Sequence, residues 1–454
     1  MSGIEGLERR TAADVGRAIA GGLDPVAVAE FFLERIAASP DQAVFLHVAA
    51  ARARREAEAS RRRHAEGRPL GPLDGVPISW KDLVDVAGTP TTAASALRRD
   101  IAPATADAAA VANATAAGMV NLGKVNLTEF AYSGLGLNPH YGTPINPHDP
   151  ETPRAPGGSS SGSAVSVARG LVPISVGSDT GGSVRIPAAF NGLVGCKSSE
   201  GRIPKTGVVA LSPTLDTLGL LARSVEDCIL ADAALRGVTP PSLPVPDVAA
   251  LRFVLAPNVV MDGVEDAVAD NLEKAVSRLS AAGARIERRT LPMFDAMVAT
   301  TAAHGSLTAA EAYWVHRDLV DGPDVGRIDR RVVARIMGGK KMSAHDLVAV
   351  QQARIAQIAA LEAALDGALL VVPTTPHVAP EIAPLEADDD LFHKVNLKTL
   401  RNTMLGNFLA TPGLALPTGT DGHGMPTSML VSATAGQDER LLAAGIAIER
   451  CLAG

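Results

Sequence analysis

Two clusters of glycine and serine are the part of the sequence best suited to carry chemistry. The first is Gly157-Gly158-Ser159-Ser160-Ser161, and the second is Asp179-Thr180-Gly181-Gly182-Ser183. Glycine and serine bury little surface and lose much conformational freedom on folding, so packing alone does not favour this composition. A site that brings hydroxyl and backbone N–H groups close to a substrate would require it.

A lysine upstream completes a known pattern. Lys81 ends the apolar segment Gly75-Val76-Pro77-Ile78-Ser79-Trp80-Lys81, and Ser183 lies 24 positions after Ser159. These segments resemble the signature of the amidase signature family, hydrolases with a Ser-Ser-Lys triad. The resemblance runs from about residue 74 to residue 223, and more weakly to the C-terminus. It implies a hydrolase of carboxylic amides that needs no cofactor and has a cis peptide bond at Ser159.

The resemblance also assigns the catalytic roles. Ser183 is expected to form the acyl-enzyme, Ser159 to bridge, and Lys81 to accept the proton. Lysine has a reference pKa of about 10.4, so it must be desolvated to serve as a base near neutral pH. Burial can lower the pKa by up to roughly 3–5 units, and the apolar residues before Lys81 are consistent with burial. A lysine at a strand end is otherwise usually a surface charge.

Amide hydrolysis also needs donors that face the developing oxyanion. Two adjacent glycines permit backbone angles that turn successive N–H groups inward, although a plain tight turn is the alternative. We expect Arg185 to brace this loop through carboxylate or carbonyl contacts rather than to contact the substrate. The predicted donors are the N–H groups of Thr180, Gly181, Gly182 and Ser183.

The resemblance places the substrate's acyl group beside the segment Phe130, Ala131, Tyr132 and Ser133, in which Phe130 and Tyr132 are expected to supply apolar surface. This segment carries no charge, and an unpaired buried carboxylate is costly. We therefore expect neutral aliphatic or aryl amides and anilides, with carbamates as an extension, ahead of glutamine and acidic amides. Arg202, or a residue between 292 and 345, remains a candidate for an unseen cation.

Other site types have less support. Residues 158–162 fit the G-x-S-x-G pattern of α/β-hydrolases with Ser160 as nucleophile, but the preceding residues 149–156 are a proline-rich loop instead of the required strand. His377, His393 and His423 have no recognisable triad context. The ten histidines form no H-E-x-x-H motif, so no metal site is expected.

Two other functions stay open. One is the glutaminase component of a tRNA-dependent amidotransferase, which shares the triad. It is disfavoured because glutamine-clamping residues are not recognised in the C-terminal half and because residues 127–136 depart from the pattern of that component. The other is a catalytically silent binding protein, which is disfavoured because Lys81, Ser159 and Ser183 are all present.

Composition narrows the partners and the location. The sequence is 46% hydrophobic and 20% charged with a net charge of −7, which argues against nucleic acid or an anionic membrane as partner. Three cysteines without C-x-x-C spacing favour a reducing, cytoplasmic location, and neither a signal peptide nor a transmembrane segment is expected. The expected partner is a small amide or carbamate, bound by a monomer or homodimer.

The order of apolar segments predicts an α/β fold with a single large mixed β-sheet sandwiched between helices. Residues 1–67 are expected to form helices, 68–236 the signature core, 237–250 a linker-like loop, and 251–454 the rest of the amidase domain. Within the last part, 292–345 is expected to form irregular helices near the site entrance. Predicted strands are 76–80, 119–122, 171–176, 251–255, 285–291, 369–372, 413–417 and 429–431; predicted helices include 105–118, 225–235, 264–281, 348–365 and 438–451.

Overall fold

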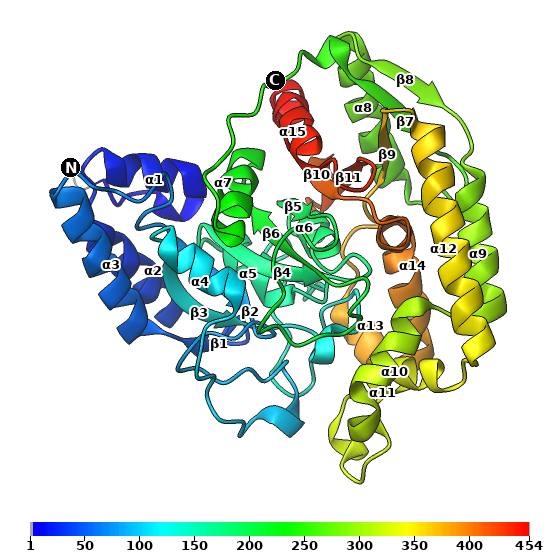
Figure 1. The fold of residues 1–454 in the computed structure, drawn as a ribbon, viewed down its shortest axis with the longest axis horizontal. Helices are drawn as coiled ribbons and strands as arrows, with labels where there is room; N and C mark the ends of the chain where they lie inside the picture. The colour runs from blue at the N-terminus through cyan, green and yellow to red at the C-terminus, as the bar shows by residue number, and fades with distance from the viewer. Residues whose placement is uncertain (1–2, 454) are drawn as a thin grey trace.

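The computed structural model describes residues 3–453 and contains one eleven-stranded β-sheet through the middle of the molecule (Figure 1). The strands follow the spatial order β1-β3-β2-β4-β6-β5-β10-β11-β9-β7-β8. They are β1 (Phe45–Val48), β2 (Pro77–Lys81), β3 (Val120–Val125), β4 (Ile174–Asp179), β5 (Val194–Lys197), β6 (Thr217–Ala222), β7 (Arg252–Leu255), β8 (Arg285–Arg288), β9 (Leu369–Pro373), β10 (Gly413–Thr420) and β11 (Pro426–Ser432).

The sheet is mixed, and it crosses the linker-like segment. β2 is parallel to β3 and to β4, whereas β4, β6, β5, β10 and β11 pair antiparallel in turn. β5 pairs with β10, with Cys196 opposite Leu414, so strands from before and after residues 237–250 share one ladder. The predicted single mixed sheet is confirmed.

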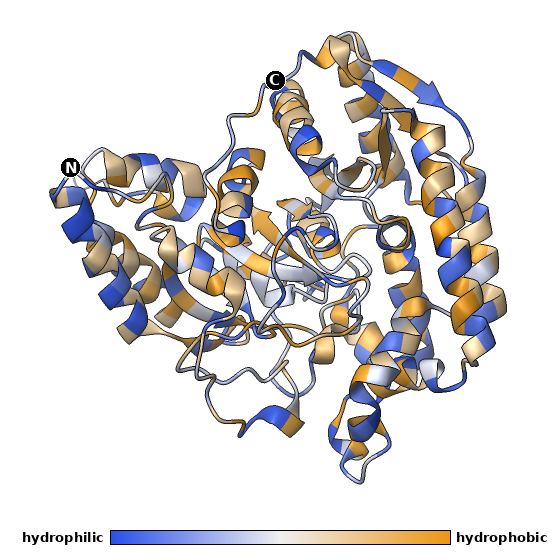
Figure 2. Cartoon of the chain, viewed as in Figure 1, coloured by the Kyte–Doolittle hydropathy of each residue, from blue (hydrophilic) through white to orange (hydrophobic). Residues whose placement is uncertain are grey.

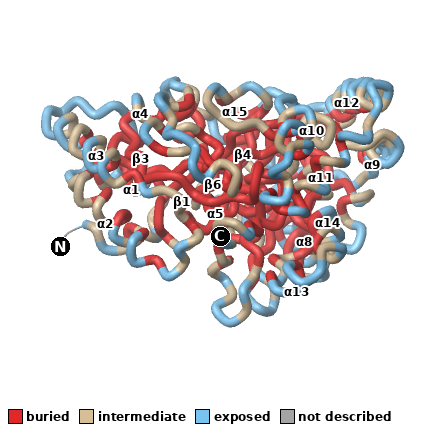
Figure 3. Tube along the Cα trace, turned by 90° about the horizontal axis from the view of Figure 1, so that it is seen from below, coloured by how far each residue is buried: buried red, intermediate tan, exposed pale blue. Residues whose placement is uncertain are grey.

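Helices enclose this sheet, and the trace is buried through the centre and exposed at the periphery (Figure 3). Many helices alternate hydrophilic and hydrophobic residues, as expected where one face packs on the sheet (Figure 2). They are α1 (Ala12–Ala20), α2 (Pro25–Ala37), α3 (Ala50–Ala65), α4 (Ala109–Ala116), α5 (Ser161–Ala168), α6 (Arg185–Phe190), α7 (Val225–Arg236), α8 (Asp266–Ala281), α9 (Pro292–His304), α10 (Leu307–Val320), α11 (Arg330–Lys340), α12 (Ala344–Leu365), α13 (Ile382–Ala387), α14 (Asp389–Phe408) and α15 (Asp438–Ala453).

The local sequence of β2 explains why Lys81 is buried at the end of this strand. Side chains alternate between the two faces of a strand, so Ile78 and Trp80 enter the main core while Lys81 takes the opposite face. All five residues of β2 are buried. Because β2 and β4 are parallel neighbours, their carboxyl ends meet at one edge of the sheet, and the second Gly-Ser cluster begins there.

The predicted elements exist, but some boundaries moved. The strand expected at 171–176 begins three residues later and runs to Asp179, and the helix expected at 105–118 is only α4. Residues 292–345 were expected to form irregular helices, and they form the helices α9, α10 and α11. At the start of α1, the side chain of the N-cap residue Thr11 accepts a hydrogen bond from the Asp14 N–H.

No helix in residues 3–453 is both long and apolar enough to cross a bilayer.

The central strands should dominate stability. Leu220 in β6 is 1% exposed within the main core, so Leu220→Ala should lower the free energy of unfolding by about 2–5 kcal/mol. Chemical unfolding followed by circular dichroism measures this. Val298→Ala on α9, at a side chain that is 50% exposed, is the control and should have little effect. Equal effects of the two substitutions would contradict the burial described here.

Candidate functional site

The ammonium or amine of Lys81 lies in a cage of serine oxygens. Its Nζ is 2.7 Å from Ser159 Oγ and 2.9 Å from Ser178 Oγ, with the Ser178 carbonyl oxygen at 3.5 Å. The side chain of Lys81 is fully buried. One of these serines lies in the first Gly-Ser cluster, and the other directly precedes the second.

The electrostatics of this cage favour the neutral amine. Within residues 3–453, no carboxylate lies within ion-pair distance of Lys81. Burial lowers the pKa of Lys81 to about 7, although the negative charges of Asp179 and Asp216 act in the opposite direction. A substantial fraction of the side chain is therefore neutral near pH 7 and able to accept a proton.

Hydrogen bonds of the backbone fix the position of Ser159 relative to Thr128 and Ser183. The peptide bond between Gly158 and Ser159 is cis, as the family resemblance implied. The Ser159 carbonyl accepts a hydrogen bond from the Thr128 N–H at 3.1 Å, and the next residue, Ser160, donates its N–H to the Ser183 carbonyl at 3.2 Å. In the described residues, no hydrogen bond joins the hydroxyls of Ser159 and Ser183. Lys81 and Ser159 are thus in direct contact, while Ser183 is linked to them through the backbone.

A buried ion pair shapes the loop that carries Ser183. The Arg185 guanidinium donates to both oxygens of Asp179, at 2.8 and 3.0 Å, and Asn407 from α14 donates to the same carboxylate at 2.8 Å. Burial alone would raise the pKa of Asp179, but Arg185 holds it well below its usual value. Arg185 therefore braces the loop, as expected.

The four predicted oxyanion donors are not equivalent. The Gly182 N–H donates to Asp179 at 2.9 Å and is therefore not free. The N–H groups of Thr180, Gly181 and Ser183 have no protein acceptor in residues 3–453. Gly182 still requires glycine, because its φ is +127° and an added Cβ would lie 2.1 Å from Thr403 Oγ1.

A narrow cavity of about 40 Å³ adjoins Ser183. The predicted residues Ala131, Tyr132 and Ser133 line it, together with Thr180 and Gly181. The sequence analysis did not single out the other lining residues, which come largely from the second half of the chain: Leu211, Ser306, Thr308, Arg335, Leu400 and Met404.

The Ser133 hydroxyl is not free for a substrate. It donates its proton to Asn396 Oδ1 at 3.1 Å and accepts a hydrogen bond from the Leu135 N–H at the same distance. Phe130 does not line the cavity but stacks on His316 of α10, with ring centroids 4.7 Å apart. These contacts fix the segment around Tyr132 rather than bind a ligand.

Arg335 of α11 is the one charged residue among the described residues that line this cavity. Its guanidinium carbon lies 4.4 Å from the centroid of the Tyr132 ring, and its Nε is buried without a hydrogen-bond partner in the described residues. Burial lowers the pKa of Arg335. Arg202, the other arginine that the sequence left open, pairs instead with Asp232 at 2.7 Å.

A hydrogen bond to Glu129 fixes the position of α11. The buried carboxylate of Glu129 accepts a hydrogen bond at 2.6 Å from the N–H of Asp329, the N-cap residue of α11. Glu129 lies three residues before Tyr132 in the chain. The helix that carries Arg335 is therefore tied to the predicted substrate-binding segment.

Ser178 could have been found from the sequence. Ser178 lies two residues after the strand predicted at 171–176 and one residue before the second cluster, and Lys81 ends a neighbouring parallel strand. No sequence motif indicated Arg335, because its position beside the cavity depends on how α11 packs.

The alternative sites receive no support. The Ser160 hydroxyl donates to the Ser178 carbonyl at 3.2 Å, and the ring nitrogens of His377 contact Thr399 Oγ1 and the Val378 carbonyl, so these residues form no triad. In residues 3–453 no three His, Cys, Asp or Glu side chains gather as a metal site would need. Cys196 and Cys228 are buried free thiols.

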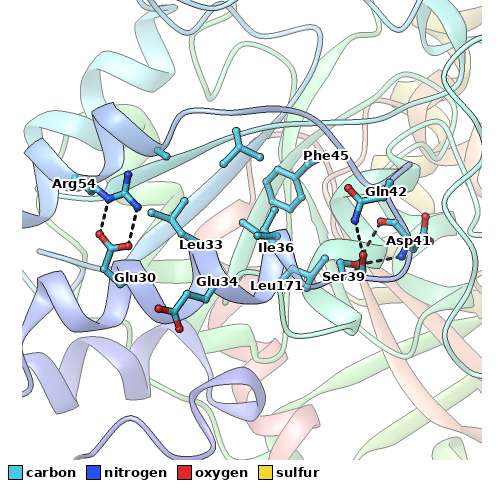
Figure 4. A pocket seen from close by; sticks show the side chains of 13 residues that line it. Glu30, Leu33, Glu34, Ile36, Ser39, Asp41, Gln42, Phe45, Arg54 and Leu171 are labelled. Carbon is cyan, nitrogen blue, oxygen red and sulfur yellow. Dashed lines mark hydrogen bonds and ion pairs between the residues drawn. The ribbon is translucent and has the colours of Figure 1, made fainter.

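A separate cavity of about 370 Å³ lies beside α2 and β1 (Figure 4). Leu33, Ile36 and Phe45 supply its apolar wall, and Glu30 is paired with Arg54 at 2.6 Å. It contains none of the predicted catalytic residues. The larger cavity is therefore not the one associated with the catalytic candidates.

Comparison with known proteins gives the family. The family model described as Amidase matches residues 27–442. The chain is 36% identical over 411 residues to 2-amino-5-chloromuconic acid deaminase from Comamonas testosteroni, covering 88% of this chain and 86% of that protein. It is 33% identical to one of the subunits of glutamyl-tRNA(Gln) amidotransferase from Thermobifida fusca, covering 98% of this chain and 96% of that protein.

The fold agrees with this assignment. A crystal structure of an amidase superposes with a TM-score of 0.86 at 30% identity, covering 98% of this chain and all of that chain. The chain therefore belongs to the amidase family, and it is an enzyme that hydrolyses amide bonds.

The depressed pKa of Lys81 predicts a pH dependence. The protonated amine cannot accept a proton, so kcat/KM should fall as the pH drops through an apparent pKa of about 7 and reach a plateau above it. Initial rates under subsaturating substrate measure this profile.

The Asp216→Asn variant tests whether Lys81 is the group whose titration causes this pH dependence. The charge of Asp216 raises the pKa of Lys81, so removing it should shift the same limb to lower pH. An unchanged limb, or a midpoint near that of free lysine, would contradict the assignment.

Proposed function

We propose that this amidase cleaves carboxylic amides through an acyl-enzyme on Ser183, with Ser159 and Lys81 as the proton relay. The observation that carries the proposal is the 2.7 Å contact between Lys81 Nζ and Ser159 Oγ in a buried setting that lowers the lysine pKa to about 7. A neutral amine in contact with a hydroxyl can draw its proton and, in turn, activate a second hydroxyl.

The reaction then has two halves. Ser183 Oγ attacks the amide carbon as its proton passes through Ser159 to Lys81, and the C–N bond breaks as the same proton returns to the leaving nitrogen. Water repeats the sequence on the ester and releases the acid. The free N–H groups of Thr180, Gly181 and Ser183 would stabilise the oxyanion, whereas Gly182 would act through Asp179.

Support also comes from a relative. The protein from Comamonas testosteroni is named for removing an amino group from an acid, which suggests ammonia as a leaving group here. A substrate of the carbamate type remains compatible with the same relay. No cofactor enters any step of the proposed relay.

The glutaminase function of an amidotransferase is the second candidate, because the relative from Thermobifida fusca covers nearly the whole chain. Glutamine carries an ammonium group, yet no Asp or Glu is among the described residues that line the cavity beside Ser183. This favours a free-standing amidase. Co-purification of a second polypeptide in stoichiometric amount with the native protein would favour the glutaminase instead.

Substitution of the relay tests the proposal. Ser183→Ala and Lys81→Ala should each lower kcat by several orders of magnitude, about 10⁴-fold or more, and Ser159→Ala should lower it nearly as much, because residues that act as one unit are strongly non-additive. Steady-state rates on a chromogenic amide measure these losses. Circular dichroism should show that the variants remain folded.

Ser160→Ala is the matched control, since its hydroxyl is equally buried but contacts only the backbone of Ser178. Its loss of activity should be mild. A fluorophosphonate probe should label the wild type and Ser160→Ala but not Ser183→Ala. Labelling of Ser183→Ala at an unchanged rate would refute Ser183 as the nucleophile.

A further inference from the structure

Arg335 has no anionic partner among the described residues. Within residues 3–453, no carboxylate lies within ion-pair distance of its guanidinium, and its buried Nε has no acceptor. Arginine does not lose its proton in proteins, so the charge cannot be removed by titration. The side chain of Arg335 is only half-buried, but its Nε is fully enclosed, and a buried donor without an acceptor in the described residues calls for a functional explanation.

Contact with Tyr132 does not satisfy this group. The aromatic face attracts a cation, and Arg335 lies 4.4 Å from its centroid. The ring face offers no in-plane acceptor for the N–H groups of the guanidinium, which are directed outward in a fork that matches a carboxylate. The stacking therefore orients the fork and leaves its hydrogen-bonding capacity unused.

The rest of the cavity suits an anion as well. Ser306 is the N-cap of α10, where the helix dipole favours negative charge. Its oxygen accepts a hydrogen bond from the Ala309 N–H at 3.2 Å, so its proton remains available to a ligand. Thr308 adds a second hydroxyl to the same wall.

The cavity also limits the ligand. Its volume of about 40 Å³ restricts the part of the ligand beyond the reacting carbonyl to a short chain. Its lining includes one cation and no acidic residue within the described part of the chain. A short acyl chain with one carboxylate fits this pattern, whereas an amino acid amide would bring an ammonium group without a partner.

We propose that Arg335 binds a carboxylate on the substrate's acyl group, so that the enzyme prefers monoamides of short dicarboxylic acids. This inference rests on the proposed acyl-enzyme at Ser183 and names its substrate class. It replaces the neutral acyl group expected from residues 131–133 alone, because those residues did not reveal the cation that packs on Tyr132. Arg335 is a substrate-binding residue in this scheme, not part of the proton relay.

Three amides with the same four-carbon acyl chain test the inference. Succinamate carries a carboxylate, butyramide lacks it, and asparagine adds an ammonium group. The wild type should have the highest kcat/KM on succinamate, at least about 100-fold above butyramide and asparagine, since these two leave the guanidinium unpaired or bring an unpaired ammonium into the cavity. Equal rates on succinamate and butyramide, or a preference for asparagine or glutamine, would overturn the proposal.

Substitution of Arg335 tests the role of this residue. Arg335→Gln should lower the ratio of kcat/KM for succinamate over butyramide by at least about 100-fold, chiefly through KM, and Arg335→Lys should recover part of it. Arg330→Gln removes an exposed arginine from the same helix and should leave the ratio unchanged. A loss shared equally by both substrates would indicate a merely structural role for Arg335 and overturn the inference.

Calorimetry separates this inference from the proposed function. Ser183→Ala protein should bind succinamate at least about 100-fold more tightly than butyramide, although it turns over neither. If both amides bind equally while Ser183→Ala remains inactive, the relay stands and the carboxylate site is refuted. This measurement also covers the case in which Arg335→Gln does not fold.

Discussion

The structure depends on one costly arrangement, the burial of a lysine amine that has no carboxylate within ion-pair distance among residues 3–453. Burial disfavours the charged form, so the pKa of Lys81 falls to about 7 and the side chain becomes a base under physiological conditions. An adjacent carboxylate would have stabilised the ammonium and removed that property. The hydroxyls of Ser159 and Ser178 supply hydrogen bonds without a negative charge, and the buried end of β2 holds the amine among them.

Asp179, which directly follows Ser178 in the chain, is a buried charge that is fully paired. Asp179 is paired with Arg185 and with Asn407 from α14, so its charge is fixed and its oxygens hold the backbone of the loop before α6. Because Asn407 lies beyond the linker-like segment, the loop requires both halves of the chain. The single sheet, in which β5 pairs with β10, gives those halves a fixed relation. A fully paired ion pair therefore positions the proposed nucleophile, and Lys81, which has no ion-pair partner among residues 3–453, is the proposed base.

The sequence predicted the parts of the site that are local and missed those that depend on packing. Lys81, Ser159 and Ser183 sit in dense motifs, and alternating or periodic apolar residues located most strands and helices. Two hydrogen bonds could not be predicted, because they depend on the path of the folded backbone. The Gly182 N–H donates to Asp179, and the Ser133 hydroxyl donates to Asn396. Arg335 lies in the segment 292–345, for which the sequence predicted only irregular helices, and the packing of α11 beside Glu129 brings it to Tyr132. The family match and fold agree with the predicted class, while the residue roles remain proposals.

Direct titration of Lys81 tests the central claim. Protein labelled with ¹³C at the lysine Cε carbons would show one resonance per lysine, and comparison with Lys81→Met would assign the resonance of interest. Its chemical shift should follow a pKa of about 7, well below the value of about 10.4 for free lysine. A Lys81 resonance that titrates as free lysine does would show that the amine is charged at neutral pH and would contradict the account.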